Sequence, residues 1–224
     1  MIHIYYESIH GRGRQMISLC CILRNEEKNL KQFLSHYKGL ADEVIIVDTG
    51  SKDKTIKTAK KFTNRIFSFR WQDDFSIARN FSIEKASKRW ILWLDPDEII
   101  DKKDFWEIRQ LTEKSAFLGF RLIQETYFRN KLVSTRGICK LFRNNKGIQF
   151  SYPVHETVRQ SIKASSGRIG KTGIRVKHYP ELGKWKSAYY FELLEKKKKE
   201  FPESSWRKEL ENEVKLFKQL EIQP

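Results

Sequence analysis

The first half of the chain alternates short, continuous apolar runs with segments in which apolar residues recur at helical spacing. Runs of this length without polar interruption are typical of strands buried on both faces, as in a parallel sheet. In the first helical segment, Leu30, Phe33, Leu34 and Tyr37 fall on one face. The pattern predicts strands at 16–23, 43–47, 65–69 and 90–94, and helices at 25–40, at 54–62 after an Asp53 cap, and from Phe75 onward.

The pattern changes after residue 115, where strand-like segments are separated by short polar turns. Such spacing indicates antiparallel hairpins added to one edge of the sheet. The predicted strands here are 117–128, 132–142, 148–154 and 173–180, followed by two helices beyond Lys184. The fold class expected is α/β: a mixed sheet with helices on both faces, an antiparallel extension and a C-terminal helical pair. The expected division is an extension of unclear role at 1–15, a domain at 16–180 and a helical appendage at 181–224.

Composition narrows the class of protein. With 224 residues the chain suits one main domain, and 44 Lys and Arg against 28 Asp and Glu give a net charge of +16. This excess favours anionic partners, although a solvated lysine-rich surface explains it equally well. Three cysteines form neither a disulfide framework nor a metal-binding spacing, which favours a reducing compartment. No apolar run approaches the roughly 18 to 20 residues of a spanning helix, so we expect a cytoplasmic protein, peripheral at most to an anionic membrane.

Charged and polar side chains follow the predicted buried strands. In open α/β sheets, ligands bind outside the carboxyl ends of the strands, and the ends of parallel strands share one edge. Clusters at several strand ends therefore indicate a functional cleft at this edge. The clusters are Arg24, Asn25 and Glu26; Asp48, Thr49 and Ser51; Asp95, Asp97 and Glu98; and, between them, Asp73, Asp74 and Arg79.

The acids of "WILWLDPDEIID" directly follow the most apolar strand. Like charges this close repel, so a positive charge is expected among them. Asp95 and Asp97 can face one point, and Mg²⁺ or Mn²⁺ prefers such oxygen ligands shared with substrate phosphates. Arg79, near a helix N-terminus, adds a second anion-binding element. The alternative is that Asp95 or Asp97 caps the next helix, although Asp101 already fits that position.

Four ordered segments carry a resemblance to a known family: "ISLCCILRNEEKNL", "ADEVIIVDTGSKDKT", "WQDDFSIARNFSIEKA" and "WILWLDPDEII". They resemble the successive motifs of family 2 glycosyltransferases, which have the GT-A fold. The likeness is greater to the bacterial branch of lipopolysaccharide-core and bacteriocin-peptide glycosyltransferases, and it runs from Met16 to His178. The resemblance implies a nucleotide-sugar donor, a divalent metal (Mn²⁺ or Mg²⁺) and inverting transfer to an envelope-glycan, lipid-linked or peptide acceptor.

The resemblance also assigns residues. Asp95-Pro96-Asp97 matches the D-x-D motif, in which Asp97 would bind the metal and Asp95 the ribose or a metal-bound water. Pro96 departs from the Ala that is frequent in this branch, but its side chain would point away from the metal. The nucleotide-sugar site would comprise Leu23, Arg24, Asn25, Glu26, Asp48, Ser51, Asp74, Arg79 and Asp95, and the metal site Asp95, Asp97 and His178.

The second half of the chain offers a candidate base. "LFRNNKGIQFSYPVHETV" resembles a family stretch in which His-Glu follows a strand at the acceptor side, so Glu156 is the candidate general base and His155 the alternative. A structural turn after Pro153 would equally explain this pair. His178 resembles a late histidine that completes the metal site in many GT-A enzymes, although a lone histidine at a strand end is often structural.

Three other classes of protein stay open at this point. The charge of +16 fits a nucleic-acid-binding protein, but the cluster edge is acidic and no nucleic-acid module is recognisable, so no nucleic-acid partner is expected. A non-catalytic scaffold on the same fold is a second class. A nucleotidyltransferase could also use paired aspartates, but it would need a glycine-rich phosphate loop near the N-terminus that this sequence lacks.

Overall fold

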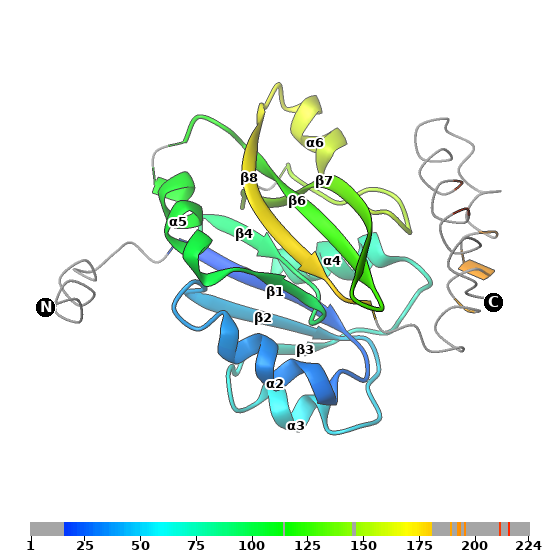
Figure 1. Ribbon diagram of the computed structural model, residues 1–224. Helices are drawn as coiled ribbons and strands as arrows, with labels where there is room; N and C mark the ends of the chain where they lie inside the picture. Colours follow the sequence, from blue (N-terminus) through cyan, green and yellow to red (C-terminus); the bar gives the residue numbers. More distant parts are fainter. Residues whose placement is uncertain are drawn as a thin grey trace, which may run out of the picture.

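The computed structural model of the protein describes residues 16–113, 115–144 and 147–180, and six isolated positions beyond residue 188 (Figure 1). The expected extension at 1–15 and the C-terminal helices therefore lie outside the residues described, except for those positions. Within the described part of the chain, no helix is long and apolar enough to cross a membrane. The helical elements are α2 (Glu27–His36), α3 (Thr55–Ala59), α4 (Phe75–Glu84), the 3₁₀ turn η1 (Lys102–Asp104), α5 (Phe105–Glu113) and α6 (Arg159–Ala164).

Eight strands form one mixed sheet in the order β3-β2-β1-β4-β7-β6-β8-β5. The first four strands in this order are parallel, whereas β7 pairs antiparallel with both β4 and β6, and β8 lies parallel to β6. The predicted α/β class with a mixed sheet is thus confirmed. The strands are β1 (Ile17–Leu23), β2 (Glu43–Asp48), β3 (Ile66–Ser68), β4 (Trp90–Trp93), β5 (Glu98–Ile100), β6 (Gly119–Phe128), β7 (Lys131–Arg143) and β8 (Ile169–His178).

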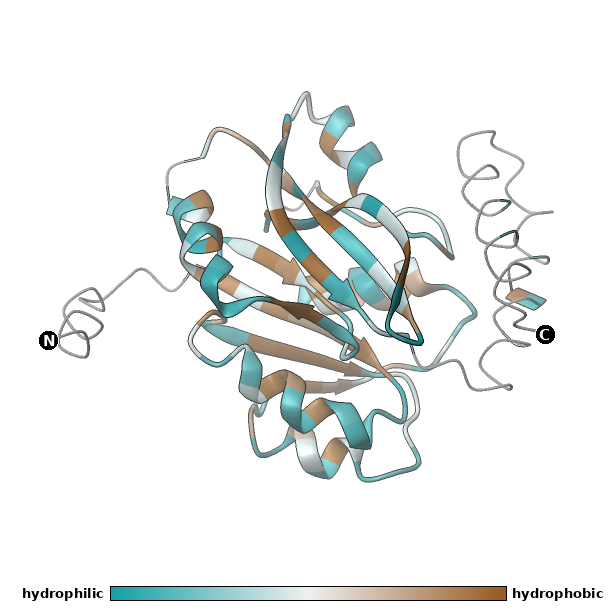
Figure 2. Ribbon diagram, viewed as in Figure 1, coloured by the Kyte–Doolittle hydropathy of each residue, from teal (hydrophilic) through white to brown (hydrophobic). Residues whose placement is uncertain are grey.

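Helices cover both faces of the parallel half. Every residue of β1 is buried, and its side chains alternate between two cores. Leu19 and Cys21 pack in the cluster that holds the apolar faces of α2 and α5, while Cys20 packs in the cluster that includes Ile83 of α4. Figure 2 shows the corresponding concentration of apolar residues along the central strands. Burial on both faces explains why these strands read as uninterrupted apolar runs.

The structure differs from the prediction in four places. Segment 148–154 forms no strand; Ile148 and Phe150 fill the core, and the pairing is limited to one isolated bridge between Ser151 and Thr157. Strand β5 and helix α6 were not predicted. The Asp101 side chain does not cap the following helix but lies 3.2 Å from Lys177.

The three cysteines are core residues. Cys20 and Cys21 are buried in β1 and Cys139 in β7. Burial raises the pKa of all three thiols, that of Cys139 to about 12. They are therefore neutral, unreactive packing groups.

The Glu43 carboxylate connects β1, β2 and the segments before β3 and β4 at one end of the parallel sheet. Glu43, the first residue of β2, has a side chain that is 6% exposed and lies 3.3 Å from the Arg65 guanidinium. It accepts hydrogen bonds from the Ser18 hydroxyl on β1 and, at 2.8 Å each, from the backbone and side chain of Ser87. Burial raises the pKa of Glu43, but these hydrogen bonds and Arg65 outweigh it, so the pKa lies below its ordinary value.

Glu43→Gln is expected to lower the free energy of unfolding by about 1 to 3 kcal/mol at neutral pH, because an amide cannot accept from all of these donors. A lowered folded-state pKa stabilises the protein above the unfolded-state pKa, and this contribution is lost as pH falls through the folded value. The difference from wild type should therefore shrink toward about pH 3. Urea denaturation at both pH values measures it, with the exposed Glu107→Gln as a control near zero; a difference that persists in acid contradicts the account.

Candidate active site

The loops that follow β1 and β2 are joined by hydrogen bonds at the carboxyl edge of the sheet. The Asn25 backbone donates to the Ser51 hydroxyl at 2.9 Å, and Ser51 in turn donates from its backbone to the Asp48 carboxylate at 3.0 Å. The Thr49 backbone donates to the Leu23 carbonyl at 3.0 Å. Asn25 adopts a φ of +56°, a region in which asparagine is tolerated. Predicted site residues from two separate sequence segments therefore lie together.

Asp48 also borders a cavity beside the edge strand β3. The cavity has a volume of about 410 Å³ and is open to solvent, and its lining mixes isoleucine side chains with polar and charged groups. Its lining residues are Asp48, Ile56, Lys60, Asn64, Ile66 and Ser68.

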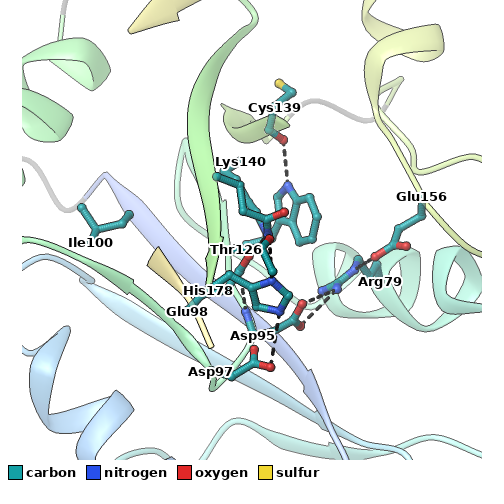
Figure 3. Close-up of polar contacts among 12 residues, drawn as sticks. Arg79, Asp95, Asp97, Glu98, Ile100, Thr126, Cys139, Lys140, Glu156 and His178 are labelled. Atoms are coloured by element: carbon teal, nitrogen blue, oxygen red, sulfur yellow. Dashed lines mark hydrogen bonds and ion pairs between the residues drawn. The ribbon is translucent and has the colours of Figure 1, made fainter. Parts of the chain in front are cut away.

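The acidic loop after β4 is neutralised by cations of the protein itself (Figure 3). The side chains of Asp95, Asp97 and Glu98 each lie next to a different basic residue, so the expected positive charge is present without a metal. The pairs are Asp95 with Arg79, Asp97 with His178, and Glu98 with Lys140.

Arg79 on α4 connects the acidic loop with Glu156. Its guanidinium donates to both oxygens of Asp95, at 3.0 and 3.1 Å, and through Nε to the Glu156 carboxylate. It also lies 4.2 Å from the centre of the Trp93 ring, a cation–π contact. Burial lowers the pKa of Arg79, but the charges of Asp95 and Glu156 outweigh it and raise the pKa above its ordinary value. Burial likewise raises the pKa of Asp95, but Arg79 and Lys140 hold it below its usual range.

Asp97 of the acidic loop lies next to His178 at the end of β8. The His178 Nε2 lies 3.5 Å from the Asp97 Oδ2, and Nδ1 lies 3.2 Å from the Thr126 hydroxyl. Burial lowers the pKa of His178, but the hydrogen bond and charge of Asp97 outweigh it, so the pKa is raised. The Asp97 Oδ1 is buried and has no hydrogen-bond partner among the residues that the structure describes. An orphaned carboxylate oxygen of this kind calls for an additional ligand.

This pair fits a divalent cation that takes its remaining ligands from elsewhere. Within the described ranges, no group of three or more His, Cys, Asp or Glu side chains could hold a metal ion. Mg²⁺-type ions are commonly bound by one or two protein groups together with substrate phosphates and water. Asp97 and His178 could supply two such groups, whereas both oxygens of Asp95 accept hydrogen bonds from Arg79.

The segment with His155 and Glu156 is held against α4. The Asn80 side chain exchanges hydrogen bonds with the Phe150 backbone at 2.8 and 3.0 Å, and the Phe75 backbone donates to the Pro153 carbonyl at 2.8 Å. His155 has a φ of +53°, a strained conformation that turns the chain directly before Glu156. The Glu156 side chain is 10% exposed.

Other predicted site residues have more local contacts. Asp74 caps α4, because its carboxylate accepts from the Ile77 backbone at 3.2 Å and from the Ser76 hydroxyl at 2.6 Å. The Arg24 side chain is exposed at the edge of the cleft, and Glu26 precedes α2. Five residues of the site were not expected from the sequence. Gln124 and Lys140 bind Glu98, and Thr126 lies next to His178. Trp93 packs against Arg79, and the exposed Arg136 connects Gln124 with His155.

This geometry, with polar loops at the carboxyl edge of a parallel sheet and a paired acidic loop, agrees with the sequence comparison. The profile of the family described as Glycosyl transferase family 2 matches residues 18–162. The chain belongs to this family. The domain is therefore a glycosyltransferase domain, and the resemblance seen in the sequence is confirmed.

Curated relatives agree with the family. A TPR repeat-containing protein of Synechococcus elongatus is 36% identical over 154 residues, which cover 69% of this chain and 38% of the relative. The SPbeta prophage-derived glycosyltransferase SunS of Bacillus subtilis is 31% identical over 141 residues, 60% of this chain and 33% of SunS. The chain thus spans only about a third of the length of these relatives.

Solved structures share the fold at low sequence identity. S. aureus TarS in complex with UDP-GlcNAc matches with a TM-score of 0.61 and 15% identity, covering 80% of this chain and 64% of that one. Glucosyl-3-phosphoglycerate synthase from Mycobacterium tuberculosis, in complex with Mn²⁺, UDP and glucosyl-3-phosphoglycerate, matches with a TM-score of 0.57 and 15% identity, covering 76% and 74%.

Arg79→Met is expected to lower the free energy of unfolding by about 3 kcal/mol, because it removes the cation from Glu156, whose side chain is 10% exposed, and from Asp95, whose side chain is 33% exposed. Without the guanidinium the pKa of Asp95 rises, so this carboxylate is protonated more readily and the loss should decrease as pH falls. Urea denaturation across pH measures both effects. Lys54→Met, at a side chain 74% exposed and 3.7 Å from Glu27, should change stability by less than about 1 kcal/mol; equal losses for the two variants would refute the burial argument.

Proposed function

We propose that the domain transfers a sugar from a nucleotide-diphosphate sugar to an acceptor hydroxyl or thiol, with inversion at the anomeric carbon. The observation that carries the proposal is the arrangement of Asp97, Arg79 and Glu156 at one edge of the sheet. It combines a carboxylate oxygen that lacks a partner, a buried cation and a candidate base. The donor class is supported by the UDP and UDP-GlcNAc that the two structural relatives bind.

The donor would lie across the loops after β1, β2 and β4. Asp48 and the Leu23–Glu26 segment would hold the nucleoside, with Ser51 fixing the Asp48 carboxylate through its backbone. Arg79 binds both oxygens of Asp95 and so fixes the orientation of this carboxylate. In that orientation Asp95 would contact the ribose. Asp74 would act indirectly, by starting the helix that carries Arg79.

Asp97 and His178 would hold a divalent metal, Mn²⁺ or Mg²⁺. When bound, such an ion offsets the charge that develops on the diphosphate leaving group. The guanidinium of Arg79 would supply a second, fixed positive charge at the same place. Metal binding requires the neutral imidazole, so Asp97 and His178 would exchange their mutual contact for metal ligation.

Glu156 would be the general base. Its carboxylate accepts a hydrogen bond from the Arg79 Nε, which holds it in place before the donor binds. A donor diphosphate would compete with Glu156 for the guanidinium and leave the carboxylate free to accept the acceptor proton. The acceptor oxygen or sulfur forms its new bond to the anomeric carbon while the bond to the nucleoside diphosphate breaks. His155, whose Nδ1 lies 3.2 Å from Arg136, is the alternative base.

The net charge of the chain supports an anionic acceptor. The excess of basic residues favours phosphorylated or lipid-linked envelope precursors at an anionic membrane surface, with a peptide as the alternative acceptor. A non-catalytic scaffold is the second candidate function. The full set of paired acidic and basic groups favours the enzyme over the scaffold.

The donor site is tested by thermal denaturation with UDP-, GDP-, CMP- and dTDP-sugars, each with and without Mn²⁺. One nucleotide class should raise the melting temperature in a metal-dependent way, because it binds only the folded protein. Asp97→Asn should abolish this shift, whereas Asp101→Asn, which affects only the pair with Lys177, should keep it. A folded protein that responds to no donor would favour the scaffold.

The base is tested by Glu156→Gln, which keeps the hydrogen bond from Arg79 but cannot accept a proton. It should lower kcat by about 10² to 10⁴ and leave donor affinity unchanged. Turnover measured by nucleotide release with a hydroxylated acceptor, and donor affinity measured by calorimetry, separate the two effects. If His155→Gln produces the larger loss in kcat, His155 is the base instead.

A further inference from the structure

A second polar network, which does not include Arg79, contacts the acidic loop through the backbone of Asp95. At its centre is Glu98, the first residue of β5, which is fully buried. Its Oε2 accepts from the Lys140 ammonium at 2.7 Å and from the Asp95 backbone N–H at 3.0 Å, and its Oε1 accepts from the Gln124 side-chain amide. Lys140 is itself 1% exposed and lies 3.6 Å from the centre of the Trp93 ring.

This network specifies one arrangement of the loop. Three donors converge on Glu98, and only an ionised carboxylate can accept from all of them. A buried ion pair adds little net stability compared with an apolar pair of the same volume, so stability alone does not account for Glu98 and Lys140. The pair instead fixes the Asp95 N–H, and with it the direction in which the chain runs through Pro96 to Asp97.

The network also reaches the opposite side of the cleft. The Gln124 side-chain oxygen accepts from the Arg136 Nε at 2.8 Å, and the Arg136 Nη1 lies 3.2 Å from the His155 Nδ1. His155 directly precedes Glu156. The acidic loop and the Glu156 segment are therefore linked twice, through Arg79 on one side and through Gln124 and Arg136 on the other.

We propose that Glu98 is a positioning residue: with Lys140 and Gln124 it fixes the donor-side loop, and through Arg136 it sets the position of the His155–Glu156 segment. The role of this link in turnover rests on the proposed function. The link itself does not, because it can be measured in the protein without substrate.

Amide hydrogen exchange tests the link directly. Glu98→Gln should accelerate exchange in peptides covering 94–98 and also 152–158, because one amide oxygen cannot satisfy three donors. Arg136→Met, at an exposed residue, should accelerate exchange only in 152–158. The matched control is Glu125→Gln, at a carboxylate that is 5% exposed and paired with Arg175, which should change neither peptide.

Exchange that accelerates only in 94–98 in Glu98→Gln, or in neither peptide, overturns the link. Should that variant fail to fold, Gln124→Leu replaces it, because this change keeps the Glu98–Lys140 pair and removes the bonds that Gln124 makes to Glu98 and to Arg136. It should accelerate exchange in 152–158. Unchanged exchange in that peptide would contradict the proposal.

Donor affinity and turnover test the positioning role. Well below its melting temperature, Glu98→Gln should bind the donor about tenfold more weakly or worse, whereas Arg136→Met should keep donor affinity and lower kcat. A purely structural Glu98 would reduce the melting temperature of the folded variant but not its donor affinity. If wild type binds no nucleotide sugar, the proposed function fails, and the exchange measurements still decide whether the two segments are linked.

Discussion

A single arginine, buried between two carboxylates from distant parts of the chain, is the constraint on which the site depends. Arg79 can be charged at 4% exposure only because Asp95 and Glu156 lie on either side of it and Trp93 lies against its planar group. These partners come from β4 and from the segment after residue 150. Helix α4 must therefore dock on the sheet and on that segment at once, and each docking stabilises the other.

The charges of the site are consequently arranged in pairs. Arg79 and Lys140 each pair with one acid of the 95–98 loop and His178 lies beside the third, so the negative charge of the loop does not by itself require a metal. The case for a metal rests instead on the partnerless Oδ1 of Asp97. This is a more specific argument than charge counting, because it selects Asp97 over Asp95 as the ligand.

The parallel half of the fold could be predicted because its strands are buried on both faces and leave uninterrupted apolar runs. Strand β5 could not be predicted, because it has only three residues and begins with a charged one, Glu98. The partner that allows Glu98 to be buried, Lys140, lies 42 positions later in the sequence. Segment 148–154 alternates like a strand, yet its backbone bonds go to Phe75 and Asn80 of α4, to Ser161 of α6 and to Thr157 instead of to a neighbouring strand. The sequence did contain one usable signal for the missed network. Gln124 and Lys140 are polar residues at inward positions of otherwise apolar strands, which indicates buried partners.

The strand order also has a consequence for how the molecule assembles. Strand β4, which leads into the acidic loop, lies between β1 and β7, and β5, which begins at Glu98, pairs only with β8 among the described strands. During synthesis, the first hundred or so residues could form a parallel core, but their acidic loop would lack Lys140, Glu156 and His178. Long loops must close before those contacts form, which slows folding. The acidic loop therefore lacks part of its ionic partners until β8 has been synthesised. The site that would bind ligands is completed late in the folding of the domain.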